Sequence, residues 1–329
     1  MSLNGTGIER RVVGGDLVGL HRRRGVPTVV ADPDRAAVAA GLLSGALATT
    51  GLLGCGAMPV AMPPAGVVAG SLEHVLYLTL GATIRHQRVA RELWEGARLT
   101  HQDRETRYLF MPGAVADASI DRVAAGLHRH GLSSRPRQDA LLWRTVARTL
   151  EEKWAGDPRE FISDCGWDAT VLLRRLRADR HPAGDRFVPD YPGLRGERAG
   201  ALWIRSLRFE AGLSDLRNLE RVPVPVDHHI ARASLALGVV RGSYSGSLAG
   251  IRPSIREAWT RGVDGLAHGD RPMVALDLEA PLRMLSRAGC VARNAENGYC
   301  PRRYRCEAAA FCQPGIVDVS PDWPVRLDT

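Results

Sequence analysis

Four of the six cysteines in the chain lie near its C-terminal end, with a spacing that suits metal binding. They are Cys290, Cys300, Cys306 and Cys312, in the pattern C-x9-C-x5-C-x5-C. Four thiolates so close in sequence can bind one soft metal centre, either a four-iron iron–sulfur cluster or a zinc ion. Two disulfides that fasten the C-terminal segment are the alternative, although six cysteines in 329 residues are too few for a disulfide-dense secreted scaffold.

Arginine is concentrated between the second and third of these cysteines, where Arg302, Arg303 and Arg305 surround Tyr304. A loop held at both ends and rich in arginine suits contacts with phosphate groups, whereas the simpler interpretation is a solvated surface. The whole chain has a formal charge of +8 and an isoelectric point near 9.6. This charge favours an anionic partner, either nucleic acid or an acidic membrane surface.

A second motif, YPGLRGERAGALWIRSL at residues 191–207, joins a tight turn to a helix. Backbone amides at such a helix start can bind a phosphate group, which makes Gly193, Arg195 and Gly196 candidate contacts to nucleic acid. Glycine-rich turns also precede many helices that bind nothing. The motif therefore indicates phosphate binding only in combination with the others.

A third motif, VPVPVDHHIARASLALG at residues 222–238, places Asp227 at the start of an amphipathic helix. Two prolines hold the preceding chain extended, and the helix dipole keeps the carboxylate ionised, as a catalytic anion requires. A plain helix cap is the simpler role for this residue. His228 and His229 are expected to face different sides of the helix, so we do not expect them to share a metal ion.

Taken in chain order, the Pro-Gly turn, the Asp227 motif and then the four cysteines resemble the layout of the helix-hairpin-helix DNA glycosylases that carry an iron–sulfur cluster. This superfamily contains endonuclease III and the adenine mismatch glycosylase. The resemblance extends from about Ser71 to Cys312. Within it, LEHVLYLTLGATIRHQRVARELW is similar to the family's opening helix, and GLHRHGLSSRPRQDALLWRTVARTLEEKWAGDPREF is similar to the helix pair before the hairpin.

The resemblance implies a role for each motif. Asp227 matches the catalytic aspartate, which stabilises the positively charged sugar and helps to direct a water molecule at C1′ while the N-glycosidic bond breaks. The target nucleotide is extruded from the duplex into a pocket. The four cysteines match the cluster ligands, although the first two intervals are each three residues longer than in the family pattern.

Departures from the family pattern bear on mechanism. Glu197 stands where lyase members have a nucleophilic lysine, and the only lysine of the chain, Lys153, lies in a different predicted helix. These residues predict a monofunctional glycosylase that leaves an abasic site. Arg195 replaces the second glycine of the hairpin, and Gly81 replaces the glutamine that fills the gap in the duplex, so the wedge residue is not identified. About twelve extra residues precede Asp227 and are expected near the pocket.

Apolar residues recur at helical spacing along most of the chain, and Asp168 is expected to cap one of these helices. Only DLVGL and VPTVVA near the N-terminus look extended. We therefore predict an all-α, two-domain helix-hairpin-helix glycosylase fold with a small extended N-terminal addition. Residues 101–214 would form a helical barrel with the hairpin, and residues 71–100 and 215–329 a cluster domain that includes the opening helix. Residues 1–70 would pack on this core as an extension.

The segment from Ala36 to Leu72 contains no charged residue and approaches the length of a membrane span. Its alanine, glycine and proline content makes it only weakly apolar, so we expect a buried helix over Ala36–Leu47 followed by a loop. The N-terminus has no signal-peptide pattern. The prediction is a cytoplasmic monomer that binds double-stranded DNA and no membrane.

Two other classes of function remain open. One is a non-catalytic DNA- or RNA-binding helix-hairpin-helix protein with a structural metal cluster, in which Asp227 is only a cap. The other is an iron–sulfur redox protein that reuses this fold. An assay of base excision distinguishes the glycosylase hypothesis from these two classes, because a protein that only binds nucleic acid releases no base.

Overall fold

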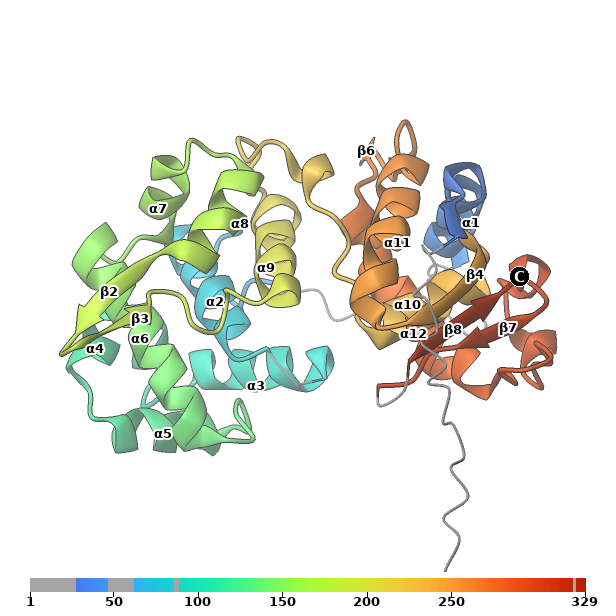
Figure 1. The fold of residues 1–329 in the computed structure, drawn as a ribbon. Helices are drawn as coiled ribbons and strands as arrows, with labels where there is room; N and C mark the ends of the chain where they lie inside the picture. The colour runs from blue at the N-terminus through green and yellow to red at the C-terminus, as the bar shows by residue number, and fades with distance from the viewer. Residues whose placement is uncertain (1–27, 47–61, 86–88, 322–323) are drawn as a thin grey trace, which may run out of the picture.

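The computed structural model describes residues 28–46, 62–85, 89–321 and 324–329, which fold around two hydrophobic cores (Figure 1). Helices make up most of the structure, as predicted, but three small antiparallel sheets accompany them. The expectation of an all-α protein is therefore corrected to a largely helical one. Helices α2 to α9 occupy one half of the molecule, while α1 and α10 to α12 form the other half together with the largest sheet.

Among the described residues, the first half contains eight α-helices and one two-stranded sheet. Its elements are α2 (Leu72–Thr83), α3 (Ala90–Gln102), α4 (Pro112–Asp117), α5 (Ile120–Arg129), α6 (Pro136–Trp154), α7 (Pro158–Asp164), α8 (Ala169–Ala178), β2 (Arg180–Ala183), β3 (Arg186–Pro189) and α9 (Glu197–Phe209). Helix α2 is the central one, because every side chain from His74 to Thr83 is buried. This explains why its sequence is apolar nearly all round rather than on one face.

The second half combines four helices with two sheets. Its elements are β1 (Thr28–Ala31), α1 (Pro33–Ala46), α10 (His228–Ala236), β4 (Val240–Gly246), α11 (Leu248–Gly262), β5 (Ala267–His268), β6 (Arg271–Pro272), α12 (Glu279–Ala288), β7 (Ile316–Asp318) and β8 (Val325–Asp328). The main sheet has the order β1-β4-β8-β7 and is antiparallel throughout. Gly242 permits the pairing of β1, since a Cβ atom there would lie 2.1 Å from the Thr28 carbonyl oxygen.

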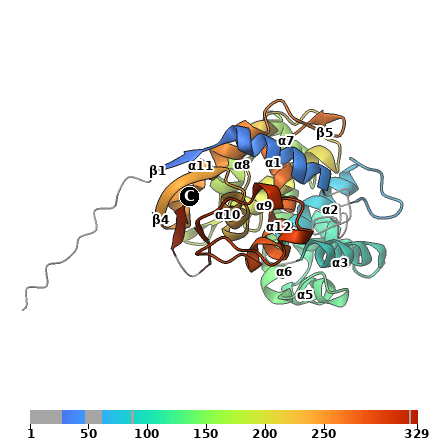
Figure 2. The ribbon, with the colours of Figure 1, turned by 90° about the vertical axis from the view of Figure 1, so that its right-hand side faces the viewer.

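The N-terminal predictions are met in part. VPTVVA does contain a strand, β1, whereas DLVGL lies outside the described residues. The predicted helix over Ala36–Leu47 is α1, which packs along α11 (Figure 2). Its buried residues Ala36 and Leu43 belong to the second core, and residues 47–61 are outside the described part. Among the described helices, none combines the length and the apolar character that crossing a bilayer requires.

The two cores divide the chain differently from the predicted domains. Residues 71–100, expected beside the cysteines, contribute Val75 and Trp94 to the first core. The boundary expected at residue 215 lies later, because Val222 still belongs to the first core while Val224 and Val226 belong to the second. The alternating prolines keep this connection extended, so that it crosses between the cores and ends at Asp227.

Candidate active site at the start of helix α10

Asp227 is the N-cap residue of α10. Its Oδ1 atom accepts hydrogen bonds from the backbone N–H groups of His229 and Ile230, at 3.0 and 3.1 Å. These bonds satisfy two of the amides that a helix start leaves without partners. The Oδ2 atom makes a different contact, since it accepts a 2.7 Å hydrogen bond from Nη2 of Arg283. The side chain is 37% exposed, so a ligand can reach it.

Asp227 is the first member of a line of side chains with alternating charge, which continues through Arg283 and Glu279 to Arg198. Arg283 also donates through Nε to Glu279, at 2.8 Å, and Glu279 accepts a second bond, of 2.7 Å, from Nε of Arg198. Glu279 is buried, with a relative exposure of 2%. Because a buried carboxylate between two guanidinium groups fixes both of them, Arg283 is held in place beside Asp227. Arg198 lies on α9 and Glu279 and Arg283 lie on α12, so this line also joins the two halves.

The charge state of Asp227 follows from opposing effects. Partial burial raises the pKa of its carboxyl group. The charge of Arg283 and the hydrogen bond from the Ile230 N–H group lower this pKa, and together the lowering effects are larger. The net result is a pKa below the ordinary value for aspartate. Asp227 is therefore a carboxylate at neutral pH.

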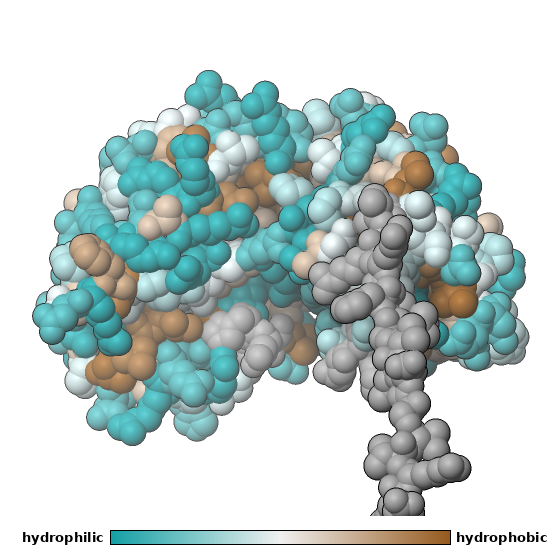
Figure 3. Space-filling view, in the orientation of Figure 1, coloured by the Kyte–Doolittle hydropathy of each residue, from teal (hydrophilic) through white to brown (hydrophobic). Residues whose placement is uncertain are grey.

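Two adjoining cavities open at Asp227 and together form a cleft between the halves. One has a volume of about 660 Å³ and the other about 610 Å³. Both are lined by Asp227 and His228 from the second half and by Glu197 and Arg198 from α9. Hydrophilic residues predominate on the face shown in Figure 3, including the recess between the halves. The candidate carboxylate thus lies in a cleft that several charged residues line and that is large enough for a nucleotide-sized ligand.

The predicted turn precedes α9 and packs tightly on the first half. Gly193 is required there, because a Cβ atom at this position would lie 1.9 Å from the Thr83 carbonyl oxygen. The N–H groups of Leu194 and Arg195 both donate to the Tyr191 carbonyl oxygen, at 3.1 and 3.0 Å. These two amides are therefore used inside the turn.

Arg195 and Gly196 are both exposed at this turn. Gly196 is the N-cap of α9, with a φ of −64° that any residue can adopt and open space where a Cβ atom would lie, so the turn does not require glycine there. No side chain caps this helix start. Gly196 and the first residues of α9 line the cleft, so the N–H groups that this helix start leaves without a side-chain cap lie at its wall.

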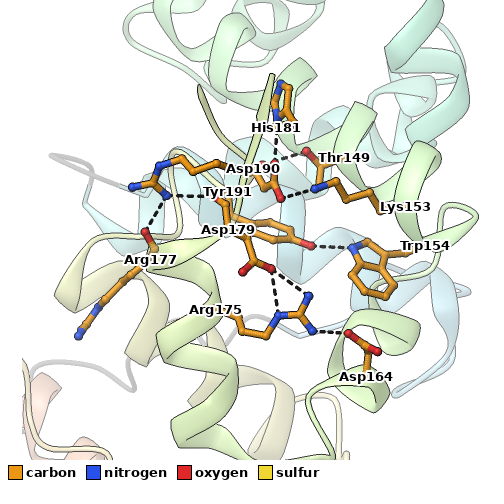
Figure 4. A network of polar contacts seen from close by, with 11 residues as sticks. Thr149, Lys153, Trp154, Asp164, Arg175, Arg177, Asp179, His181, Asp190 and Tyr191 are labelled. Carbon is orange, nitrogen blue, oxygen red and sulfur yellow. Dashed lines mark hydrogen bonds and ion pairs between the residues drawn. The ribbon is translucent and has the colours of Figure 1, made fainter. Parts of the chain in front are cut away.

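A polar network under the turn holds it in place (Figure 4). The carboxylate of Asp190 is 1% exposed and accepts bonds from Lys153 Nζ, at 2.6 Å, and from His181 Nδ1, at 2.8 Å. The next residue, Tyr191, accepts a 2.8 Å bond from the Trp154 indole through its hydroxyl oxygen, and burial raises its pKa. Since Lys153 is bound in this network and lines neither cavity at Asp227, it is not placed to act as a nucleophile there.

Glu197 holds the start of α9 to the second half. Its carboxylate pairs with Arg256 and lies 3.9 Å from Arg252, both on α11. Glu197, which the resemblance aligns with the lyase lysine, is thus an anion that two arginines neutralise. It has no group that could attack a sugar as an amine does.

The two histidines after Asp227 lie closer together than predicted. The ring centroids of His228 and His229 are 4.0 Å apart, although adjacent residues in a regular helix point in different directions. Burial, followed by the charge of His228, lowers the pKa of His229 to about 4. His229 is therefore neutral at physiological pH.

All four cysteines of the C-terminal motif carry free thiols. Burial raises the pKa of Cys290, and the charges of Cys312, Cys306 and Cys300 raise it further, which places the four sulfurs in one electrostatic neighbourhood. Among the described residues, no set of three or more histidine, cysteine or acidic side chains is close enough to hold a single metal ion. A four-iron cluster binds each thiolate to a different iron atom, so its sulfurs need not approach as closely as the ligands of one zinc ion.

The arginine-rich loop is exposed at Arg302, Arg303, Tyr304 and Arg305. The Arg302 guanidinium donates to the carbonyl oxygen of Ala288, the last residue of α12. Because α12 also carries Arg283 and Arg287 into the cleft, this bond connects the cysteine loop to the same helix that supports Asp227.

Two further predictions concern the surroundings of the site. Gly81 is buried in α2, where a Cβ atom would lie 2.7 Å from the Trp94 ring, so no larger side chain fits at this position. The extra residues before Asp227 do not extend toward the cleft, contrary to expectation. They pack on α8 instead, where the Asn218 amide donates a 2.6 Å bond to Asp168.

The elements that sequence reasoning missed are those that complete the site. The line from Arg198 through Glu279 to Arg283 could have been suspected only from the spacing of Glu279 and Arg283, which are four residues apart on one helix. No protein-family model and no curated protein sequence matches this chain.

Proposed function

We propose that this protein is a monofunctional DNA glycosylase that hydrolyses the N-glycosidic bond of an extruded nucleotide and leaves an abasic site. The observation that carries the proposal is the position of Asp227. Its carboxylate faces the cleft between the halves, and the start of α9, which follows the Pro-Gly turn, forms part of the opposite wall. The helix-hairpin-helix assignment of α8, the turn and α9 belongs to the same proposal.

The bonding of Asp227 suits an electrostatic role. Two carboxylate oxygens offer about four acceptor sites. Two of these are used by the helix N–H groups and one by Arg283, which leaves one site on Oδ2 for a water molecule or for the sugar. As the bond to the base breaks, positive charge develops on the deoxyribose, and an ionised, pre-oriented carboxylate stabilises that charge more than it stabilises the ground state.

The surrounding arginines support the choice of DNA as substrate. Gly193, Arg195 and Gly196 at the turn, and Arg302, Arg303 and Arg305 in the cysteine loop, are the proposed contacts to the DNA backbone. Contacts of this type are salt-dependent and largely independent of sequence. The hydrogen bond from Arg302 to the end of α12 keeps the second group near the cleft.

Cys290, Cys300, Cys306 and Cys312 are the proposed ligands of an iron–sulfur cluster, with zinc as the alternative metal. When bound, the cluster would serve as a structural tether for the loop that bears the three arginines. The chain's own residues still perform the reaction. Chelation or Cys306→Ser should weaken DNA binding, and a broad visible absorption band in the purified protein would distinguish iron–sulfur from zinc.

The decisive experiment is base release from duplexes that carry deaminated, oxidised, alkylated, mismatched or hypermodified bases. We expect the wild-type protein to produce alkali-labile abasic sites on at least one duplex and Asp227→Asn to produce them at least about 100-fold more slowly. We also expect borohydride to trap no covalent adduct, because the cleft contains no lysine among its described lining residues. An efficient trap would refute the monofunctional assignment.

A non-catalytic nucleic-acid-binding protein is the second candidate, and the Asp227–Arg283 ion pair is the observation that favours it. A carboxylate neutralised by a guanidinium group at 2.7 Å stabilises a developing cation less than a free one does. If no duplex in the panel yields abasic sites but the protein still binds DNA, and Asp227→Asn binds equally well, this second candidate is correct.

A further inference from the structure

We propose that the cleft beside Asp227 contains a binding seat for an anionic group, a phosphate or a carboxylate, formed by the guanidinium groups of Arg85, Arg198 and Arg287. The seat would recognise a second feature of the ligand whose sugar lies at Asp227. In that respect the inference rests on the proposed function, but the presence of the seat can be tested without any base release.

The three arginines reach one cavity from three separate elements. Arg85 follows the C-terminal end of α2, Arg198 lies in the first turn of α9, and Arg287 lies in the last turn of α12. All three line the cavity of about 610 Å³ that Asp227 also lines. Their convergence is a property of the tertiary structure, because they are far apart in the sequence.

The charges of this cavity are unevenly matched. Arg283 is bound by Asp227 and Glu279, and Glu197 is paired with arginines of α11. Arg198 uses its Nε atom to bind Glu279, at 2.7 Å. Within the described part of the chain, the guanidinium groups of Arg85 and Arg287 have no side-chain hydrogen bond or ion pair, although Arg85 senses the charge of Glu279 at longer range. The cavity therefore carries a local excess of positive charge.

The surroundings of Arg85 make this excess unfavourable when no ligand is bound. Burial, which outweighs the attraction of Glu279, lowers the pKa of Arg85 to about 10. A guanidinium group held in a poorly solvating site gains more from an anion than an exposed one does. The uncapped start of α9 lies in the same wall and adds partial positive charge from its dipole. An anion is consequently the chemistry that completes this part of the cleft.

Two sources could supply the anion. One is a backbone phosphate that flanks the extruded nucleotide, and the other is an acidic substituent on the target base. Both present oxygen acceptors that guanidinium groups bind in bidentate fashion. The seat is defined by this shared chemistry, and separate experiments distinguish the sources.

The first experiment tests the seat itself. Inorganic pyrophosphate is titrated calorimetrically into the full-length protein, into the double variant Arg85→Gln/Arg287→Gln, and into Arg137→Gln. Arg137 is an exposed arginine of α6 that pairs with Asp121 and does not line the cleft, so it serves as the matched control. We expect the double variant to bind about 10-fold more weakly than wild type and the control to bind equally well. Equal binding by wild type and the double variant, or no binding by wild type, overturns the proposal.

Arg287→Gln alone provides a safeguard, since Arg287 is exposed and its substitution should leave the fold intact. If the double variant fails to fold, this single variant must still weaken pyrophosphate binding several-fold. An unchanged affinity would overturn the proposal just as clearly.

The second experiment identifies the source of the anion with three duplexes. One carries a neutral target base, one has uncharged methylphosphonate linkages on either side of that base, and one carries a carboxyl-bearing pyrimidine. A phosphate source predicts that methylphosphonate weakens binding of wild type but not of the seat variant. A base substituent predicts that the carboxyl group strengthens binding of wild type only. If all duplexes affect both proteins equally, the seat does not act on DNA and the inference fails, whatever the outcome of the base-release assay.

Discussion

Asp168 and Asp227 occupy the same local position in the two halves of the molecule, and the comparison between them shows what distinguishes a cap from a candidate catalytic group. Each is the N-cap of a helix, α8 or α10, and each accepts two backbone N–H bonds through Oδ1. At Asp168 the Oδ2 atom accepts a bond from the Asn218 amide. At Asp227 it accepts a bond from Arg283 at the edge of a cleft.

The difference lies in the second oxygen and not in the capping geometry. Asp168 is held by neutral donors only, including the Thr170 hydroxyl at 2.6 Å, and these hydrogen bonds keep its pKa far below the ordinary range. None of the cavities described above is lined by Asp168. Asp227 thus differs from Asp168 in that its second oxygen lies at a cleft and has a charged partner.

The largest expected effect is on base release. Asp227→Asn should reduce the rate by about 100-fold or more, because the amide keeps the cap but cannot stabilise a positively charged sugar. Asp168→Asn is the matched control and should leave the rate within a few-fold of wild type. Single-turnover assays on the preferred duplex measure both. Equal losses in the two variants would end the distinction drawn here.

A smaller effect should follow from Arg283→Gln. The pKa of Asp227 should rise toward its ordinary value, since the charge of Arg283 is the largest influence that lowers it. Base release should fall about 10-fold, because Asp227 loses the partner that orients it. Carbon NMR titration of the aspartate carboxyl groups measures the pKa.

Arg205→Gln serves as the control for Arg283→Gln. Arg205 is an arginine of similar exposure that pairs with Asp277 and Glu210. Its substitution should leave the Asp227 titration unchanged. If the two variants shift that titration alike, Arg283 has no special role.

The order should be reversed for stability. Asp168→Ala should lower the free energy of unfolding by about 2 kcal/mol, and Asp227→Ala by about 1 kcal/mol. Asp168 makes more hydrogen bonds, and its removal leaves the Asn218 amide without its hydrogen-bond acceptor. Removal of Asp227 costs less, because Arg283 still has Glu279 as a partner. Urea denaturation curves measure both values. A larger loss for Asp227→Ala would show that its main role is structural.

The smallest effect concerns the residues that follow the two caps, because Asp227 precedes two histidines while Asp168 precedes alanine. The pKa of His229 is lowered to about 4 in the folded protein. Between about pH 6.5 and pH 4, this imidazole therefore binds a proton in the unfolded chain but not in the folded protein. The free energy of unfolding should therefore decrease as the pH falls through this window. His229→Gln should remove part of that decrease, while His128→Gln, at an exposed position on α5, should not.

The helical part of the fold was predictable from local patterns. Helix α2 begins and ends where its apolar run does, and Gly131, with a φ of +64°, follows α5 in the left-handed conformation that commonly ends a helix. Helix α11 was missed, because Pro253 lies inside it and glycine and serine precede it. Strand β4 was missed because its sequence, VRGSYSG, has little strand propensity and acquires its partners β1 and β8 from distant parts of the chain.

The candidate site was predictable to a similar degree. The prolines before Asp227 and the amphipathic helix after it locate the carboxylate at a helix start, and the Pro-Gly turn locates the start of α9. Neither motif includes Arg283, Glu279 or Arg85, and neither indicates that these residues would lie near Asp227. Whether the four cysteines bind iron–sulfur remains a prediction of their number and spacing.

The sequence by itself determined where most of the helices begin, which aspartates cap them, which residues are apolar enough to be buried, and that the chain has a single lysine. These properties depend on interactions within a few residues, so they can be recognised locally. Only the tertiary structure decided that Asp227 faces a cleft and Asp168 does not, that Arg198, Glu279 and Arg283 form one line of charges, and that Lys153 is held by Asp190. Those contacts join residues from separate elements, and the packing of the two cores brings them together.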